Sequence, residues 1–314
     1  MTTAVASDVK VISNFVELRQ RAQAAGPKSV AVVVADDDVA LTAADGALYL
    51  GIAKPVLIGD DKKIRAKTEV LKLKSLLTDA SFVHADEANS AAETAVRMAR
   101  EGRVDILLKG HLRTDELLKA VLNKEWGLRT GRVLSDVLLY EDNLTGSRRL
   151  VGITDGGLNV APDLEHKKQI VQNAIEVMWS LGLRRPKMAI MSATEAVSES
   201  VPSTVDAKAL QDMAKKGEFG DVDMLGPVAL DCALLREAAE AKGITHSVAG
   251  YADCMVVPNI ESGNLLGKAV KYLGGSQCAH VVVGAKVPIL IPSRVESADD
   301  KVNAIALGVI FAAR

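Results

Sequence analysis

Short apolar runs alternate with amphipathic segments along the whole chain, and this alternation constrains the fold more than any other feature. The run at residues 29–35 is apolar on both faces. A segment with helical spacing follows at residues 39–50, and then a second apolar run at residues 55–59. Strands that are apolar on both faces are typical of parallel sheets covered by helices. The sequence therefore predicts an α/β fold built from strand–helix–strand crossover units.

The same alternation continues to the carboxyl end. Further strands are predicted at residues 81–84, 104–109, 150–154, 187–192, 253–258, 279–284 and 287–291. Further helices are predicted at residues 11–25, 91–101, 162–181, 204–215, 230–241 and 265–273, with a last one from residue 297 on. Right-handed crossovers between such strands would give a doubly wound sheet.

The chain is long enough for two domains, because 314 residues exceed the usual size of one. A polar, glycine-bearing stretch at residues 141–147 separates the two alternating series. We expect a domain boundary at that stretch. Aromatic residues make up only 3% of the sequence, so the core of each domain must be built from alanine, valine, leucine and isoleucine.

Charge and cysteine content exclude several classes of protein. The net charge of −2 argues against a general nucleic-acid or membrane-surface role, which needs a basic excess. Cys232, Cys254 and Cys278 are odd in number and form no CxxC pair, so we expect core packing in a reducing compartment and no metal site. The amino terminus lacks a secretory pattern, and no apolar run reaches the ~20 residues of a membrane span. We therefore expect a cytoplasmic protein without a membrane partner.

The strongest chemical signal lies where the last strand meets the last helix. Ser293 and Arg294 begin this turn, and Asp300 follows in the helix, so that a hydroxyl, a cation and a carboxylate converge at the carboxyl end of a strand. The alternative is helix capping, with Ser297 as N-cap and Asp299 and Asp300 in the first turn. The local sequence leaves both interpretations open.

A second polar segment follows the strand at residues 104–109. It carries the potential cations His111, Arg113, Lys119, Arg129 and Arg132, with Thr114 as the expected N-cap of a helix. These side chains predict an anion site, although a solvated helix face explains them equally well.

Three polar turns in the second half each follow an apolar strand, namely residues 154–159, residues 192–195 with 201–206, and residues 258–264. Because strand ends of a parallel sheet meet at one edge, we expect these turns to face one cleft. The side chains expected there are Thr154, Asn159, Ser192, Ser203, Thr204 and Asn264. Capping explains any one of these turns by itself. No GxGxxG, GxxxxGK[ST], GxSxG or HExxH motif occurs, so the usual dinucleotide, P-loop, hydrolase and zinc-protease patterns are absent.

Taken together, the polar turns resemble those of the phosphate acetyltransferase and phosphate butyryltransferase family, the phosphotransacylases. The resemblance runs from about residue 30 onward and rests on ordered blocks. These are LLKGHLRTDELLKAVL, GLRTGR, ITDGGLNVAPDLEHKKQIVQNA, MSATEAVSESVPSTVDAKAL, GPVALDCA, VVPNIESGNLLGK and VVVGAKVPILIPSR. The KGH, GLRTGR and VPNIESGN blocks are more similar to the butyryltransferase branch.

This resemblance implies reversible transfer of an acyl group between coenzyme A and inorganic phosphate, in a ternary complex without an acyl-enzyme. The implied substrates are acyl-CoA, coenzyme A, inorganic phosphate and acyl phosphate, with no resident cofactor and no metal. It also implies two α/β/α domains similar to those of isocitrate and isopropylmalate dehydrogenases. The first domain would comprise residues 1–142 and 286–314 and the second residues 143–285, with a cleft between them and a homodimer formed through the second.

The resemblance assigns roles to individual residues. Asp300 would take the thiol proton of coenzyme A, Ser293 would steady the developing charge, and Arg294 would hold the phosphate. Lys119 aligns where the acetate branch carries an arginine. Two alternatives are a dehydrogenase of the same gross fold, against which the missing nicotinamide and metal signatures count, and a non-catalytic acyl-CoA-binding or regulatory protein.

Overall fold

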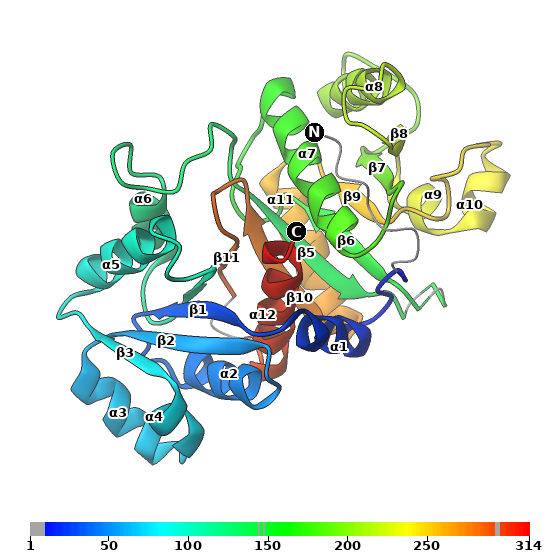
Figure 1. Cartoon of the computed structure of the whole chain (residues 1–314). Coiled ribbons are helices and arrows are strands. Elements are labelled where there is room, and N and C mark those ends of the chain that lie inside the picture. Colours follow the sequence, from blue (N-terminus) through cyan, green and yellow to red (C-terminus); the bar gives the residue numbers. More distant parts are fainter. Residues whose placement is uncertain (1–9, 144, 147, 293–295) are drawn as a thin grey trace.

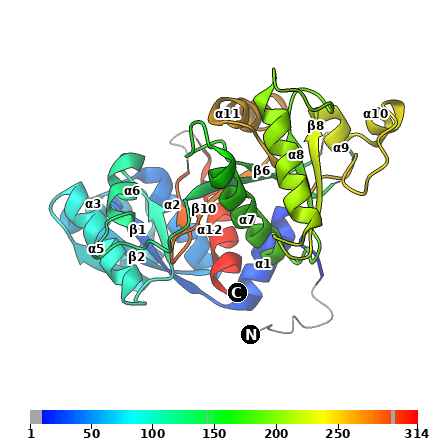
Figure 2. The same ribbon diagram turned by 90° about the horizontal axis from the view of Figure 1, so that it is seen from above.

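One sheet runs through the whole molecule in the computed structural model, which describes residues 10–143, 145–146, 148–292 and 296–314. Its strand order is β3-β2-β1-β4-β11-β10-β5-β6-β9-β7-β8. The strands are β1 (Lys28–Val33), β2 (Ala53–Gly59), β3 (Ser81–His84), β4 (Ile106–Lys109), β5 (Ser135–Glu141), β6 (Leu150–Thr154), β7 (Lys187–Met191), β8 (Asp223–Val228), β9 (Cys254–Val256), β10 (Cys278–Val283) and β11 (Ile289–Leu290). β1–β4 lie at one end and β7–β9 at the other (Figures 1 and 2).

The prediction of an α/β fold with a mostly parallel sheet is confirmed. Seven of the ten pairings between described strands are parallel. The three antiparallel pairings lie at the centre, where β10 pairs with β11 and β5, and β5 pairs with β6. β5 and β8 are absent from the predicted strands. The domain boundaries at residues 142 and 286 stay a prediction, since the sheet crosses both halves.

Helices cover both faces of this sheet. They are α1 (Phe15–Ala25), α2 (Asp38–Tyr49), α3 (Asp61–Val70), α4 (Lys74–Asp79), α5 (Ala88–Arg100), α6 (Thr114–Val121), α7 (Leu164–Ser180), α8 (Pro202–Lys215), α9 (Leu230–Leu234), α10 (Arg236–Ala241), α11 (Ile260–Lys268), the π-helical turn η1 (Ala269–Leu273) and α12 (Ala298–Ala312). None of the helices in the described ranges combines the length and the apolarity that a membrane crossing requires.

Two helix predictions need correction. The helix expected at residues 230–241 is divided at Leu235, whose backbone is extended, because the carbonyl of Cys232 bonds Gly250 and that of Ala233 bonds Ala252. The helix expected at residues 265–273 starts earlier, because Asn259 caps it by accepting a hydrogen bond from the Ser262 amide at 3.0 Å.

The two faces of the sheet are covered differently. On one face a single continuous core extends from α2 and α12 to α7 and α8. On the opposite face the core is divided into one cluster beneath α5 and α6 and another beneath α9 and α10. β10 belongs to both parts of the divided face, since Cys278 packs in one cluster and Val282 in the other. His280 lies between them in sequence and its side chain is 21% exposed, so the strip of sheet between the two clusters is not fully covered.

Helix α11 approaches the edge of this strip through two glycines that share one face. A Cβ atom on Gly263 would lie 2.7 Å from the Cα of Gly156, in the turn after β6. A Cβ atom on Gly267 would lie 3.2 Å from a terminal methyl of Leu138 in β5. Only the second neighbour is a side-chain end that can move.

We therefore predict that Gly263→Ala lowers the free energy of unfolding by about 1–3 kcal/mol, because backbone must be displaced. Gly267→Ala, one helical turn further on, is the matched control and should stay within about 1 kcal/mol of the parent, since alanine also favours the helix. Urea unfolding measures both values. Equal losses in the two variants would contradict this account of how α11 packs.

Candidate functional site

A cavity of about 480 Å³ lies over this incompletely covered strip of the sheet, and we call it the central cavity. Its walls come from the start of α6, from β5, β6 and β10, from α11 with η1, and from the segment before α12. These elements belong to both sides of the predicted boundary near residue 142. The cavity thus occupies the place where the sequence predicts a cleft.

The floor of the central cavity is buried and its mouth is exposed. Leu138, Ile153 and Cys278 on the floor are each at most 7% exposed. At the mouth, the side chain of Arg113 is 71% exposed and Tyr272 is 55% exposed. A ligand in this cavity therefore has one end enclosed by protein and the other end in contact with solvent.

A histidine between two carboxylates forms the polar part of the floor. The Nδ1 atom of His280 lies 3.0 Å from Asp136 Oδ2, and its Nε2 atom lies 3.5 Å from Glu296 Oε1. Burial alone would lower the pKa of His280, but the charge and hydrogen bond of Asp136, together with Glu296, raise the pKa to about 9. His280 is therefore protonated at neutral pH, with Nδ1–H donated to Asp136.

Asp300 is both a capping residue and half of an ion pair. Ser297 is the N-cap of α12, as predicted, and its hydroxyl donates to Asp300 Oδ2 at 2.6 Å. Lys271 Nζ lies 2.5 Å from the same oxygen, and the Cys278 amide donates to Oδ1 at 3.1 Å. Burial alone would raise the pKa of Asp300, but these three donors outweigh it and hold the pKa below its usual value. Asp300 is only 2% exposed, whereas Lys271 lines the central cavity.

The turn after β6 is organised by a second buried carboxylate, Asp155. Its oxygens accept hydrogen bonds from the amides of Gly157 and Leu158 at 2.9 and 3.0 Å and from the side chain of Asn159 at 2.5 Å. Burial, helped by the charge of Asp136, raises the pKa of Asp155. The bonds hold Gly156, Gly157 and Leu158 against the cavity.

The polar segment after β4 lies at the mouth. Arg113 and Thr114 line the central cavity, and the Arg113 guanidinium makes two bonds to Asp115 at 2.9 and 3.0 Å. The N-cap of α6 is Arg113, and not Thr114 as the sequence predicts. The helix begins at Thr114, and the Glu116 side chain accepts a hydrogen bond from the amide of Arg113. His111 is largely exposed, 4.0 Å from Asp36. Lys119 is exposed on α6 and outside the lining of the cavity.

Arg129 and Asn159 lie in a neighbouring cavity of about 630 Å³, between α6 and α7, with Arg132 and His166. Asn159 donates to the carbonyl of Leu134 at 2.8 Å, so its amide also fixes the local backbone. The structure separates these two expected binding residues from the central cavity.

The other polar residues of the second half divide in the same way. Asn264 lines the central cavity, whereas Thr154 is buried and donates to the Asp136 carbonyl at 2.8 Å. The hydroxyls of Ser192 and Ser203 lie 2.8 Å apart, outside the lining. Thr204 is buried and bonds the carbonyl of Val201 at 2.7 Å. Ser293 and Arg294 lie outside the described residues. The binding roles of all these residues stay predictions.

Sequence reasoning missed the charged residues that dominate the cavity, namely Asp136, Lys271, His280 and Glu296. Two of them carried a recognisable signal. Asp136 and His280 each interrupt an otherwise apolar strand, and a titratable side chain on a buried strand needs a partner. Their partnership follows only from the register of β5 with β10, because the two residues are 144 positions apart.

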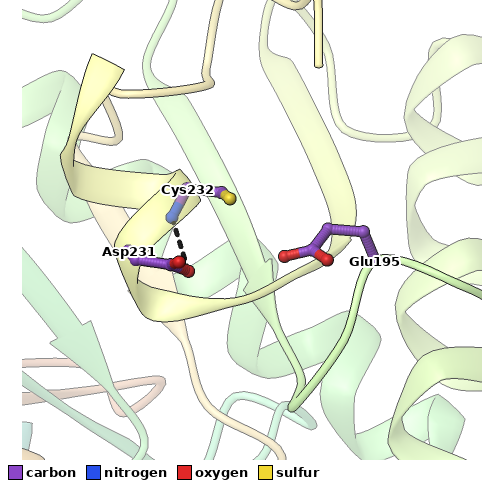
Figure 3. A group of neighbouring side chains, drawn as sticks. All are labelled: Glu195, Asp231 and Cys232. Atoms are coloured by element: carbon purple, nitrogen blue, oxygen red, sulfur yellow. Dashed lines mark hydrogen bonds between the residues drawn. The ribbon is translucent and has the colours of Figure 1, made fainter. Parts of the chain in front are cut away.

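A group of potential metal ligands lies outside the lining of the central cavity. Figure 3 shows the carboxylates of Glu195 and Asp231 near the thiol of Cys232. Lys242 Nζ lies 3.1 Å from each of the two carboxylates. This ammonium already supplies the positive charge that the carboxylates require, so the group has the chemistry of an ion-pair cluster.

The raised pKa of His280 predicts how stability depends on pH. Folding raises its pKa from 6.5 to about 9, so its stabilising contribution is complete below pH 6.5 and is lost as pH rises through 9. The difference in melting temperature between the parent and His280→Gln should therefore shrink as pH rises across this interval. A constant difference from pH 6 to 9.5, in thermal unfolding followed by circular dichroism, would exclude a protonated His280.

Comparison with known proteins places the chain among acyl-transferring enzymes. A family model described as "Phosphate acetyl/butaryl transferase" matches residues 78–309. The phosphate acetyltransferase of Rickettsia felis is 40% identical over 94% of this chain and 83% of its own length. The phosphate butyryltransferase of Clostridium acetobutylicum is 37% identical over 96% of this chain and 99% of its own length.

A solved structure agrees with this result. The branched-chain phosphotransacylase of Enterococcus faecalis superposes with a TM-score of 0.80 at 28% identity, covering 91% of this chain and 99% of that one. Because the family model matches most of the sequence and the relatives align with nearly all of it, the chain belongs to the phosphate acetyl/butyryl transferase family.

Proposed function

We propose that this protein is a phosphate acyltransferase that moves a short-chain acyl group reversibly between coenzyme A and inorganic phosphate. One observation carries the proposal. The sequence blocks typical of the family converge on one cavity, although they lie far apart in the chain. The LLKGHLRTDE, ITDGGLN, NIESGNLLGK and VPILIP blocks all contribute to its lining.

The reaction requires the movement of one proton. When a phosphate oxygen attacks the thioester carbonyl carbon, the carbon–sulfur bond breaks and its electron pair leaves on sulfur, which takes up a proton. In the reverse direction the thiol must lose that proton before sulfur attacks the acyl phosphate. Because a thiol has a pKa of ~8.5, a positioned base accelerates this step at neutral pH by about 10²–10⁴-fold.

Asp300 is our proposed base. Its lowered pKa keeps the carboxylate ionised, which is the state that a base needs. Lys271, which is bonded to that carboxylate, lines the cavity, so we propose that the thiol reaches Asp300 beside Lys271, where the ammonium also stabilises a thiolate. For Ser293 and Arg294 we propose stabilisation of developing charge and binding of phosphate, roles that suit a hydroxyl and a guanidinium.

The first test is release of thiol from acyl-CoAs. We predict release that depends on phosphate, with butyryl- or propionyl-CoA used at least as well as acetyl-CoA, and without added nicotinamide or metal. The relatives named for acetyl and butyryl transfer are of similar identity, so the chain-length preference rests on the quoted sequence blocks. Acyl-CoA binding without release would indicate the non-catalytic alternative, and nicotinamide reduction would indicate the dehydrogenase. An efficiency for acetyl-CoA more than about tenfold above butyryl-CoA would reverse the preference.

The second test distinguishes the proposed role of Asp300 as a catalytic base from its role in capping α12. We predict that Asp300→Asn lowers turnover at pH 7 by about 10²–10⁴-fold and that turnover partly recovers above pH ~8.5, where the thiol ionises unaided. Asp299→Asn is the matched control, because Asp299 lies in the same helical turn with its side chain 76% exposed, and turnover should change less than about threefold. Steady-state kinetics from pH 6 to 9.5 measure both variants.

Stability must be measured beside turnover in this experiment. As a simple cap, Asp300→Asn would cost only about 0.3–1 kcal/mol. Because the change also leaves Lys271 without its buried partner, the structure predicts a larger loss, about 3–5 kcal/mol. Near-normal turnover of a folded Asp300→Asn variant at neutral pH would restrict Asp300 to its structural contacts.

We also propose a cytoplasmic homodimer. Leu265 and Leu273, on α11 and η1 of the second half, are 70% and 88% exposed, and a partner subunit would cover such side chains. The three cysteines, all buried and free, suit a reducing compartment. Sedimentation equilibrium measures the assembly, and a monomer at micromolar concentration would exclude the dimer.

A further inference from the structure

We propose that the apolar end of the central cavity, over Leu138 of β5 and Ile153 of β6 and beside the contact of Gly267 of α11 with Leu138, holds the alkyl chain of the acyl group and limits its length. This inference rests on the proposed function and assigns a substrate part to residues that have no role in the proposed proton transfer. Its starting observation is that the cavity has two chemically different ends on one sheet face.

The register of three strands places these ends side by side. Leu138 is paired with His280 on one neighbouring strand and with Ile153 on the other. Adjacent strands are about 4.8 Å apart, so the floor changes from charged to apolar within one strand spacing. A thioester carbonyl near His280 and Lys271 would therefore have its alkyl chain against Leu138 and Ile153.

The apolar end is also the closed end. Leu138 is 7% exposed, Ile153 is 1% exposed, and Cys278 beside them is 2% exposed. The long pantetheine arm of coenzyme A must reach solvent, so we place it at the exposed mouth near Arg113 and Tyr272. An alkyl chain has no such requirement, and its burial in an apolar site is favourable.

Helix α11 forms the roof of this closed end. Gly267 lines the cavity, and a Cβ atom there would lie 3.2 Å from the Cδ1 atom of Leu138. A single methyl group on Gly267 would displace the Leu138 side chain toward the cavity and so narrow its apolar end, whereas truncation of Leu138 widens that end. The two positions allow chain length to be changed in opposite directions.

The experiment compares catalytic efficiencies for acetyl-, butyryl- and hexanoyl-CoA with saturating phosphate. Leu138→Ala should raise the hexanoyl-to-acetyl ratio about tenfold, the low end of what one to two methylenes discriminate. Gly267→Ala should lower the butyryl-to-acetyl ratio by at least about threefold, because a methyl group takes the space of the longer chain. If Leu138→Ala fails to fold, the smaller truncation Leu138→Val replaces it in the same comparison of acyl-CoAs.

Leu139→Ala is the matched control. Leu139 is the next residue of the same strand and is equally a buried leucine, but it points into the continuous core on the opposite face. The Leu139→Ala variant should lose stability as Leu138→Ala does, but its ratios of catalytic efficiency between acyl-CoAs should equal those of the parent. This comparison separates a change of cavity shape from a general loss of core packing.

The outcomes are distinct. Opposite shifts in the Leu138 and Gly267 variants, with unchanged ratios in Leu139→Ala, support the proposal. If the ratios of catalytic efficiency stay within about threefold of the parent in both the Leu138 and Gly267 variants, the proposal is wrong. If the efficiencies for all three acyl-CoAs change equally, the proposal is also wrong, and the surface would be assigned to the pantetheine arm. A parent protein that releases no thiol from any acyl-CoA would instead show that the proposed function itself is wrong.

Discussion

The antiparallel pairing of β5 with β10 is the contact on which the rest of this structure depends. It joins a strand from the middle of the chain to one near its end over six residue pairs, from Cys278–Tyr140 to Val283–Ser135. That register places Asp136, Leu138 and His280 on one face, and it places Val137, Leu139 and Val281 in the continuous core on the other. A shift of one residue would exchange the two sets, burying the charged side chains among apolar ones. Continuous packing on one face therefore stabilises a polar strip on the other.

Charges in the central cavity are balanced by protein groups. Asp136 and Glu296 share the His280 imidazolium, and Asp300 has the Lys271 ammonium. Because Asp136 and Glu296 share a single cation, the further positive charge that an anionic substrate meets comes from Lys268 and Lys109 of the lining. Because every one of these pairs links two different elements, the charge arrangement depends on the complete fold.

Sequence reasoning located the strands well where both faces of a strand are apolar. It missed β5, where Asp136 interrupts the apolar run beside the expected boundary. It also missed β8, because a glycine–proline pair such as Gly226–Pro227 favours a turn, whereas proline is tolerated in an edge strand such as this one. At the site, turn residues such as Asn264 and Arg113 were found because they follow strands. Asp300 was found, but its partner Lys271 and the pair of His280 with Asp136 were not, because these contacts depend on strand register and on a π-helical turn, which short-range patterns do not encode.

The shortest strand has a mechanical consequence. β11 comprises two residues, with one residue pair to β10 and two to β4, and it alone connects the two ends of the sheet. On the continuous face this junction is braced by α12, whose Gly308 lies against Ile106 and Leu290. On the opposite face Ile289 of β11 is buried in the cluster beneath α5 and α6. The two ends of the sheet are therefore joined at β11 by few backbone pairs and mainly by side-chain packing on both faces, so the placement of α6 at the cavity mouth relative to the floor on β5 and β10 depends on that packing.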